Sequence, residues 1–330
     1  MTANKRQLAI THDRFAIGGS FTISRGSRTH ADVVTVSLSE GDATGRGECT
    51  PYARYGETVE TVSEAINAIR PQLENGLDRK ALQSLLPAGA ARNAVDCALW
   101  DLDAKQAGKP AYALANLTAP QPVATAYTLS LDTPDAMAVA AFENRNRPLL
   151  KVKLGGDGDP ERMRAVCGHA GDAKIIVDAN EAWSPDVVWD WLDLAAELGI
   201  AMVEQPLPAG EDAVLAERAH PVTLCADESA HDRTSLAKLA GLYDMVNIKL
   251  DKTGGLTEAL AMKQAAKEAG FGVFIGCMMG SSLAMAPATL LTPGADFVDL
   301  DAPLLLSEDR DPALAFDGST LLPPPSALWG

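Results

Sequence analysis

The sequence predicts an α/β fold: a (β/α)7β barrel of the TIM type with an N-terminal α+β capping domain. Over residues 119–318, short β-like runs alternate with helical patterns, and this alternation is typical of parallel βαβ units. The runs lie at 123–129, 149–154, 174–177, 201–203, 223–226, 245–249, 272–275 and 296–299. Eight parallel strands with helices between them predict a closed barrel. An open doubly wound sheet is the alternative, but the sequence has neither glycine-rich phosphate loop, G-x-G-x-x-G or G-x-x-x-x-G-K-[ST].

The capping domain is expected to span residues 1–118. Residues 33–38 and the stretch from Gly45 to Cys49 have the composition of strands, whereas 58–74 and 90–107 have helical apolar spacing. A proline-rich stretch from Leu117 to Pro122 marks the boundary with the barrel. Residues 319–330 are expected to form a tail that returns over the surface.

Composition excludes several classes of partner. The chain has 330 residues and a formal net charge of −16, which argues against binding to nucleic acid or to an anionic membrane surface. No apolar stretch approaches the ~20 residues that a membrane span needs. Five cysteines are spread singly, which indicates free thiols in a reducing compartment. The sequence therefore predicts a cytoplasmic protein.

Charged residues stand at the ends of the predicted barrel strands, where the active sites of such barrels lie. In chain order they are Lys151 and Lys153, Asp178 with Asn180 two residues further on, Glu204, Asp227, Lys249, and Asp299 with Asp301. Each aspartate taken alone is more simply read as a helix N-cap. The set, however, brings three carboxylates from successive strands together with lysines on both sides. Such carboxylates are the ligands of a hard divalent cation, and Mg2+ fits better than zinc because no histidine or cysteine set accompanies them.

The strand-end motifs resemble one known family. K-x-K, D-A-N, E-Q-P, A-D-E-S and N-I-K-L-D-K-T-G-G lie on strands two to six, G-C-M-M-G-S-S follows strand seven, and D-L-D lies on strand eight. This combination resembles the enolase superfamily, muconate-lactonising subgroup, and within it the dipeptide epimerases. The resemblance extends to R-G-S-R, G-E-C-T-P-Y-x-R-Y-G-E and L-P-A-G-A-A-R-N-A in the first domain.

The resemblance implies an isomerase that inverts the α-carbon of the C-terminal residue of a dipeptide such as L-Ala-D/L-Glu, in the recycling of peptidoglycan peptides. One Mg2+ per subunit would be bound by Asp178, Glu204 and Asp227, and would stabilise an enediolate. Lys153 and Lys249 would be the two acid/base residues, on opposite faces of the substrate. Asn180 and Lys151 would support the site, and we expect the cation of Lys151, with the metal, to lower the pKa of Lys153.

The substrate-binding residues are also expectations from the resemblance. Asp299 and Asp301 would hold the ammonium group of the dipeptide. Cap loops around residues 18–28 and 50–57 would close the barrel mouth and supply a cation for the glutamyl side chain. Arg25 is favoured for this role, with Arg28 and Arg54 as alternatives. Ser281 either contacts the substrate or caps the helix that follows it.

Other functions use the same ligands and lysines. Muconate-type cycloisomerases and o-succinylbenzoate synthases act on substrates without an ammonium group, so D-L-D argues against them. A non-catalytic ligand-binding barrel is the alternative from another class, and the presence of all five ligand and lysine positions argues against it. The resemblance is compatible with a homo-oligomer and leaves the oligomeric state open.

Overall fold

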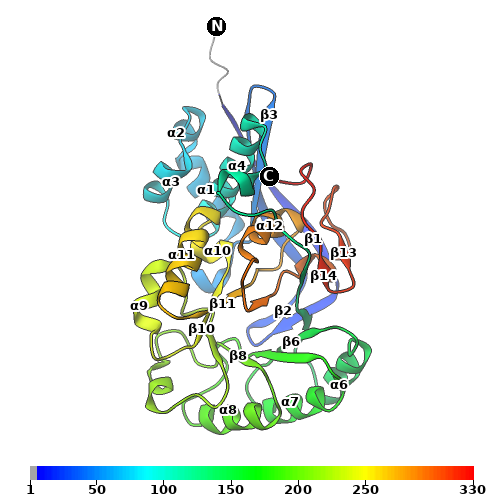
Figure 1. Ribbon diagram of the computed structural model, residues 1–330. Helices are drawn as coiled ribbons and strands as arrows, with labels where there is room; N and C mark the ends of the chain where they lie inside the picture. The colour runs from blue at the N-terminus through cyan, green and yellow to red at the C-terminus, as the bar shows by residue number, and fades with distance from the viewer. Residues whose placement is uncertain (1–5) are drawn as a thin grey trace.

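The computed structural model describes residues 6–330 and comprises a cap and a barrel. Figure 1 shows the cap, coloured blue to cyan, at one end of a barrel whose elements run from green to orange. A long blue β-hairpin extends from the cap toward the barrel strands. Within residues 6–330, no helix is long and apolar enough to cross a membrane.

The cap consists of an antiparallel sheet covered by helices. Its strands are β1 (Gln7–Ile23), β2 (Gly26–Glu40) and β3 (Ala43–Cys49), and its helical segments are η1 (Ala53–Tyr55), α1 (Val59–Ala68), α2 (Arg70–Glu74), α3 (Arg79–Leu85), α4 (Ala90–Ala107) and α5 (Ala111–Leu114). The predicted helix over 90–107 is confirmed as α4. It packs closely on β3 because Gly47 has no side chain: a Cβ there would lie 2.1 Å from the carbonyl oxygen of Ala94.

Strand β1 was not predicted from the sequence. It pairs with β2 from Gln7 opposite Ser39 to Ile23 opposite Gly26, with a register shift between Ala16 and Phe21. Most of its side chains are exposed or half-buried, so it lacks the clean apolar alternation that marks a strand. Its long hairpin with β2 replaces the first of the two expected cap loops.

The predicted barrel is confirmed as one parallel eight-stranded sheet in the order β12 to β5. Its strands are β5 (Tyr127–Leu129), β6 (Leu149–Lys153), β7 (Lys174–Asp178), β8 (Met202–Glu204), β9 (Leu224–Ala226), β10 (Met245–Ile248), β11 (Gly272–Ile275) and β12 (Phe297–Val298). A hydrogen bond from the backbone N–H of Ala126 to the carbonyl of Val298 joins the first and last strands of the barrel.

Helical segments connect the strands. They are α6 (Pro134–Glu143), α7 (Asp159–Cys167), α8 (Val188–Glu197), η2 (Ala213–Glu217), η3 (Arg233–Ser235), α9 (Leu236–Leu239), α10 (Leu250–Thr253), α11 (Leu256–Glu268), α12 (Ser282–Ala288), η4 (Thr289–Leu291) and α13 (Ala302–Leu305). Between β8 and β9 the connection contains a 3-10 helix in place of an α-helix.

The two ends of the barrel sequence meet in a small sheet. The first predicted barrel strand is split, because β4 (Val123–Ala124) pairs with β14 (Thr320–Leu321), which in turn pairs with β13 (Phe316–Asp317). After β14 the chain returns to the cap, where the indole N–H of Trp329 donates to the carbonyl of Cys97 in α4. Trp329 is 2% exposed, so the last residues are packed against the cap helix.

An apolar layer closes the inside of the barrel. One cluster contains a buried side chain from almost every barrel strand: Ala126, Leu149, Ile176, Met202, Cys225, Met245 and Phe274. Side chains on a strand alternate between its two faces. The next inward-facing residue of each strand therefore lies two positions further along the chain, closer to the cap.

Candidate active site

The charged layer of the barrel follows from that period of two. Two positions after the apolar residues stand Lys151, Asp178, Glu204, Asp227 and Asn247. All five are buried. In these five strands the inward-facing residues thus change from apolar to polar at the same level of the barrel, whereas β11 has Gly276 two positions after Phe274.

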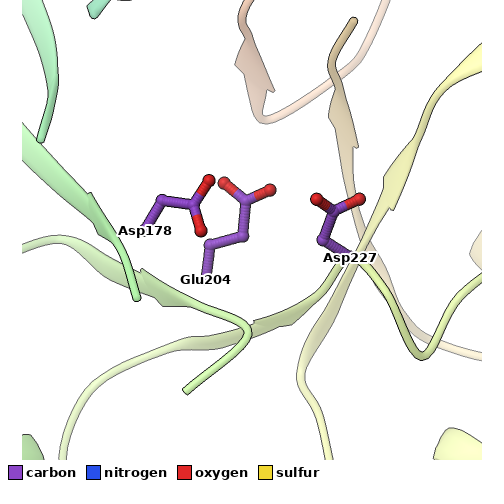
Figure 2. Close-up of side chains that lie close together, drawn as sticks. All are labelled: Asp178, Glu204 and Asp227. Atoms are coloured by element: carbon purple, nitrogen blue, oxygen red, sulfur yellow. The ribbon is translucent and has the colours of Figure 1, made fainter. Parts of the chain in front are cut away.

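Asp178, Glu204 and Asp227 form the centre of this layer. They stand at the carboxyl ends of β7, β8 and β9, and one carboxylate oxygen from each lies within 4.8 Å of the others. Figure 2 shows their carboxylate groups gathered at the ends of neighbouring strands. The exposed fractions of the three residues are 0%, 0% and 2%, so the cluster is held away from bulk water.

Two lysines flank this row of carboxylates. Lys153, at the end of β6, places its Nζ 2.7 Å from Oδ2 of Asp178. Lys249, directly after β10, places its Nζ 2.7 Å from Oδ2 of Asp227. Because β6 and β10 lie on either side of the three carboxylate-bearing strands, the two ammonium groups approach the row from opposite ends.

Lys151 lies deeper, among carboxylates. Its Nζ is 2.7 Å from Oε2 of Glu204, 2.9 Å from Oδ2 of Asp299 and 3.3 Å from Oδ2 of Asp178. Burial opposes its charge, but the Asp299, Glu204 and Asp178 carboxylates outweigh burial and hold the pKa of Lys151 above its usual value. Lys151 therefore offsets the negative charge of the cluster, and its expected effect on Lys153 stays a prediction.

Further polar groups hold the carboxylates in place. The backbone N–H of Asn180, an expected supporting residue, donates to Oδ1 of Asp178 at 2.9 Å. Three further residues, Asn247, Gln205 and Lys252, have roles that were not predicted from the sequence. Asn247 donates to Oε1 of Glu204, Gln205 Oε1 accepts from the N–H of Asp227, and Lys252 donates to the side chain and the carbonyl of Asp227. Asn247 could have been identified by its position two residues after Met245, because residues two apart on a strand face the same side.

Charge compensation in the cluster is uneven. Burial raises the pKa of Asp178 and Asp227, but the neighbouring lysines outweigh burial and keep both pKa values below the usual range. At Glu204, burial and the charge of Asp178 dominate and raise the pKa to about 7. Glu204 is thus the member of the trio whose ionisation is most easily reversed near neutral pH.

The donor set fits a hard divalent cation. Three carboxylates supply oxygen ligands and leave coordination positions open, which suits Mg2+ and does not suit metals that prefer thiolate or imidazole ligands. The trio has Asn180, Asn247, Gln205 and Lys252 as orienting partners, and such outer contacts are a regular part of metal sites.

A pocket lies between this layer and the cap. The β1–β2 hairpin and the loop after β3 line one side, and the ends of the barrel strands line the other. The lining residues are Phe21, Ile23, Arg25, Gly26, Arg28, Thr50, Tyr52, Lys153, Asn180, Asp227, Glu228, Lys249, Cys277, Met278 and Met279. Both lysines that flank the carboxylates therefore face a space that is roofed by the two expected cap segments.

The three candidate arginines occupy different environments. Arg25 donates to Oε1 of Glu228 at 2.6 Å and to Oε2 of Glu181 at 3.1 Å. Arg54 forms a two-pronged contact with Glu181 and is not among the residues that line the pocket. Arg28 lines the pocket, and its guanidinium lies 5.6 Å from the ring centroid of Tyr52. Within residues 6–330 Arg28 forms no ion pair with a carboxylate.

Asp299 and Asp301 are not among the residues that line the pocket. Oδ2 of Asp299 faces Lys151, and Oδ2 of Asp301 accepts from the N–H of Thr128 at 2.6 Å. Burial and the charge of Asp299 raise the pKa of Asp301 to about 7. Both carboxylates raise the pKa of the Cys277 thiol, after the larger effect of burial, and Cys277 lines the pocket.

Ser281 has the capping role that the sequence left as its alternative. It is the N-cap of α12, and its Oγ accepts from the N–H of Leu283. The same hydroxyl donates to Glu48 of the cap, and Arg310 contacts both residues. Ser281 is 0% exposed and does not line the pocket, so its contacts join the cap to the barrel and do not reach the pocket.

Comparison with known proteins agrees with this geometry. Residues 5–115 match the mandelate racemase / muconate lactonizing enzyme N-terminal domain, and residues 135–316 match the enolase C-terminal domain-like family. The chain is 48% identical over 313 residues to the L-Ala-D/L-Glu epimerase of Escherichia coli, covering 94% of this chain and 98% of that protein. It is 43% identical over 300 residues to the N-acetyl-D-glutamate racemase of Pseudoalteromonas sp, covering 90% and 95%.

Solved structures show the same fold with ligands bound. An enolase family member from Agrobacterium tumefaciens with homology to dipeptide epimerases holds sodium and L-Ala-L-Glu with an ordered loop. It is 56% identical, with a TM-score of 0.97 and coverage of 98% of this chain and 100% of that one. The dipeptide epimerase of Cytophaga hutchinsonii holds Mg and D-Ala-L-Val; it is 26% identical, with a TM-score of 0.90 and coverage of 98% and 94%.

The family matches span most of the chain, and the carboxylates at the strand ends form the cluster that the resemblance implied. The chain therefore belongs to the mandelate racemase / muconate lactonizing enzyme family of the enolase superfamily, and it is homologous to L-Ala-D/L-Glu epimerase.

Proposed function

We propose that the protein is a Mg2+-dependent epimerase of L-Ala-D/L-Glu that inverts the α-carbon of the glutamyl residue. The observation that carries this proposal is the pair Lys153 and Lys249, which line one pocket from opposite ends of a row of buried carboxylates. Inversion at carbon needs a base on one face and an acid on the other. The similarity to an L-Ala-D/L-Glu epimerase over 98% of its length supports the substrate.

Asp178, Glu204 and Asp227 would hold the cation. Once bound, it supplies electrostatic stabilisation for the negative charge that develops on the substrate carboxylate as the α-proton leaves. The protein contributes the burial of this layer, which excludes bulk water and strengthens every charge interaction in it.

Lys153 and Lys249 would move the proton. One lysine, in its neutral form, takes the α-proton at Nζ, and the other, in its ammonium form, delivers a proton from its Nζ to the opposite face. Inverting the other epimer exchanges these two tasks, so both epimers are substrates. Each Nζ is held by a carboxylate of the trio, which fixes the two groups with respect to the pocket.

Arg28 is the arginine that we assign to the glutamyl carboxylate. Arg25 already contacts two carboxylates, Glu228 and Glu181, and Arg54 does not line the pocket. Arg28 lines the pocket and forms no carboxylate ion pair within the described residues, so its charge is available to a ligand. This assignment replaces Arg25, which the sequence favoured, by one of the two alternatives that it left open.

Asp299 and Asp301 stay the candidates for the ammonium group of the dipeptide. Neither lines the pocket, but the charges of both act on Cys277, which does. An N-acetylated amino acid has no ammonium group for them to bind. This difference separates the dipeptide epimerase from an N-acetylglutamate racemase, the second candidate, which is favoured by the 43% identity to the Pseudoalteromonas enzyme.

The direct test is proton NMR of L-Ala-L-Glu with the protein and Mg2+ in heavy water, with N-acetyl-L-glutamate in a parallel sample. We expect loss of the glutamyl α-proton signal and the appearance of a second diastereomer, with both changes abolished by EDTA. Faster racemisation of N-acetyl-L-glutamate than epimerisation of the dipeptide would favour the second candidate. Exchange on neither compound, with Mg2+ bound, would contradict both and point to a cycloisomerase or an o-succinylbenzoate synthase.

Replacing Arg28 by Met should reduce selectivity for a charged second residue. A hydrogen bond to a charged group contributes roughly 1.5–3 kcal/mol, so the preference for L-Ala-L-Glu over the uncharged isostere L-Ala-L-Gln should fall roughly 10- to 150-fold in kcat/KM. The matched variant is Arg25→Met, which should keep the preference even if it slows both substrates. Loss of the preference in Arg25→Met and its retention in Arg28→Met would reverse the assignment.

The apparent affinity for Mg2+ should fall as the pH is lowered through 7. Metal ligands bind as carboxylates, and a pKa of about 7 leaves roughly one-tenth of Glu204 ionised at pH 6 and nearly all of it ionised at pH 8. Calorimetric titration at constant ionic strength should therefore show binding about tenfold weaker at pH 6 than at pH 8. Glu204→Gln should bind more weakly at all pH values and without this dependence. A wild-type affinity that is constant across this range would refute the role given to Glu204.

A further inference from the structure

We propose that Arg25, Arg54 and Glu181 form a latch that closes the two cap segments over the pocket as one unit. The first segment is the hairpin tip, residues 21–28, and the second is the cap loop, residues 50–57. Together these two segments form the roof of the pocket, and Arg25 and Arg54 are positioning residues that hold it closed. The latch does not depend on which substrate the pocket takes.

Glu181 joins three segments through one carboxylate. Oε2 accepts from Nη1 of Arg25 at 3.1 Å and from Nε of Arg54 at 2.7 Å. Oε1 accepts from Nη2 of Arg54 at 2.8 Å and from the backbone N–H of Ala209 at 2.8 Å. The Glu181 side chain is only 9% exposed, whereas those of Arg25 and Arg54 are 26% and 36% exposed, so the carboxylate is the buried partner of the network. The hairpin tip and the cap loop therefore share one anchor on the barrel, in addition to the contacts that each makes separately.

The Arg54 contact is the stronger half of the latch. Two N–H groups of one guanidinium meet both oxygens of the carboxylate, a geometry that adds orientation to charge. Arg25 completes the other half with four of the five N–H groups of an arginine. Besides Glu181, its partners are the carbonyl of Asn180 at 2.9 Å, the hydroxyl of Tyr52 at 2.8 Å and Oε1 of Glu228 at 2.6 Å. Tyr52 belongs to the cap loop, so Arg25 bridges the two segments directly as well.

The anchor is fixed to the metal-binding strand. Asn180 and Glu181 both have left-handed backbone, with φ of 46° and 66°, which residues other than glycine rarely adopt unless their surroundings impose it. The surroundings here are the N–H of Asn180 on Oδ1 of Asp178 and the N–H of Glu181 on the carbonyl of Gln205. The turn that carries Glu181 is therefore held in place by a carboxylate of the trio. The position of the two closed cap segments is thus fixed relative to the carboxylate cluster.

Hydrogen exchange on the full-length protein tests whether the segments open together. In Arg54→Met, the amides of the hairpin tip should exchange about tenfold faster, although Arg54 lies in the other segment. In Arg25→Met, the amides of the cap loop should respond in the same way. The amides of β6 should keep their wild-type rates, which separates opening of the roof from general loss of stability.

Arg218→Met is the matched control. Arg218 also pairs with a carboxylate, at 2.7 Å from Asp193 on the outer surface of the barrel, so the variant makes the same change of charge away from the roof. It should leave both segments at their wild-type rates. If Arg54→Met accelerates exchange only in residues 50–57, the segments move independently and the latch is overturned.

Glu181→Gln tests the shared anchor with its size unchanged. Both segments should exchange faster together, because an amide meets the two guanidinium groups with one acceptor oxygen and no charge. Wild-type rates in both segments would overturn the proposal. Under the proposed function, Arg54→Met should also raise KM for L-Ala-L-Glu several-fold more than it lowers kcat. Normal coupling of exchange with no activity on this dipeptide would count against the substrate and leave the latch in place.

Discussion

Burial of opposite charges at one level of the barrel is the constraint on which the rest of the structure depends. An unpaired carboxylate in a water-free interior is strongly disfavoured, and removing one partner of a buried ion pair typically costs about 3–5 kcal/mol. Asp178, Glu204 and Asp227 are retained there because Lys151, Lys153, Lys249 and Lys252 all lie within contact distance of one or more of them. The same arrangement that lets the layer fold also places two lysines beside a cation-binding row.

The cap turns this charged layer into a selective pocket. Glu48, Ser281 and Arg310 join the cap sheet to the loop after β11, and that loop supplies Cys277, Met278 and Met279 to the wall of the pocket. On the opposite side, Glu181 binds both Arg25 and Arg54. The cap is thus held to the barrel on both sides of the pocket, and Arg28 lines the pocket without an ion pair to a carboxylate among residues 6–330.

The sequence predicted the barrel and its charged layer because both follow from short-range patterns. Lys151, Asp178, Glu204 and Asp227 stand at the ends of short apolar runs, so they could be identified from the sequence alone. Strand β1 was missed because its pairing with β2 leaves most side chains half-buried or exposed. The partners of Ser281 and of Arg25 were not predictable for a related reason. They are Glu48 and Arg310 for Ser281, and Glu181 and Glu228 for Arg25. These residues are distant in sequence, and no local pattern indicates which of them form contacts.

The central claim is that Lys153 and Lys249 act on opposite faces of one carbon, and single-lysine variants test it most directly. With Lys153→Ala and Lys249→Ala, folding and Mg2+ binding are first checked, and exchange of the glutamyl α-proton into heavy water is then followed separately for L-Ala-L-Glu and L-Ala-D-Glu. The account predicts that neither variant interconverts the epimers, and that each still exchanges one epimer, a different one in each variant. Epimerisation by either variant, or exchange of the same epimer by both, would contradict it.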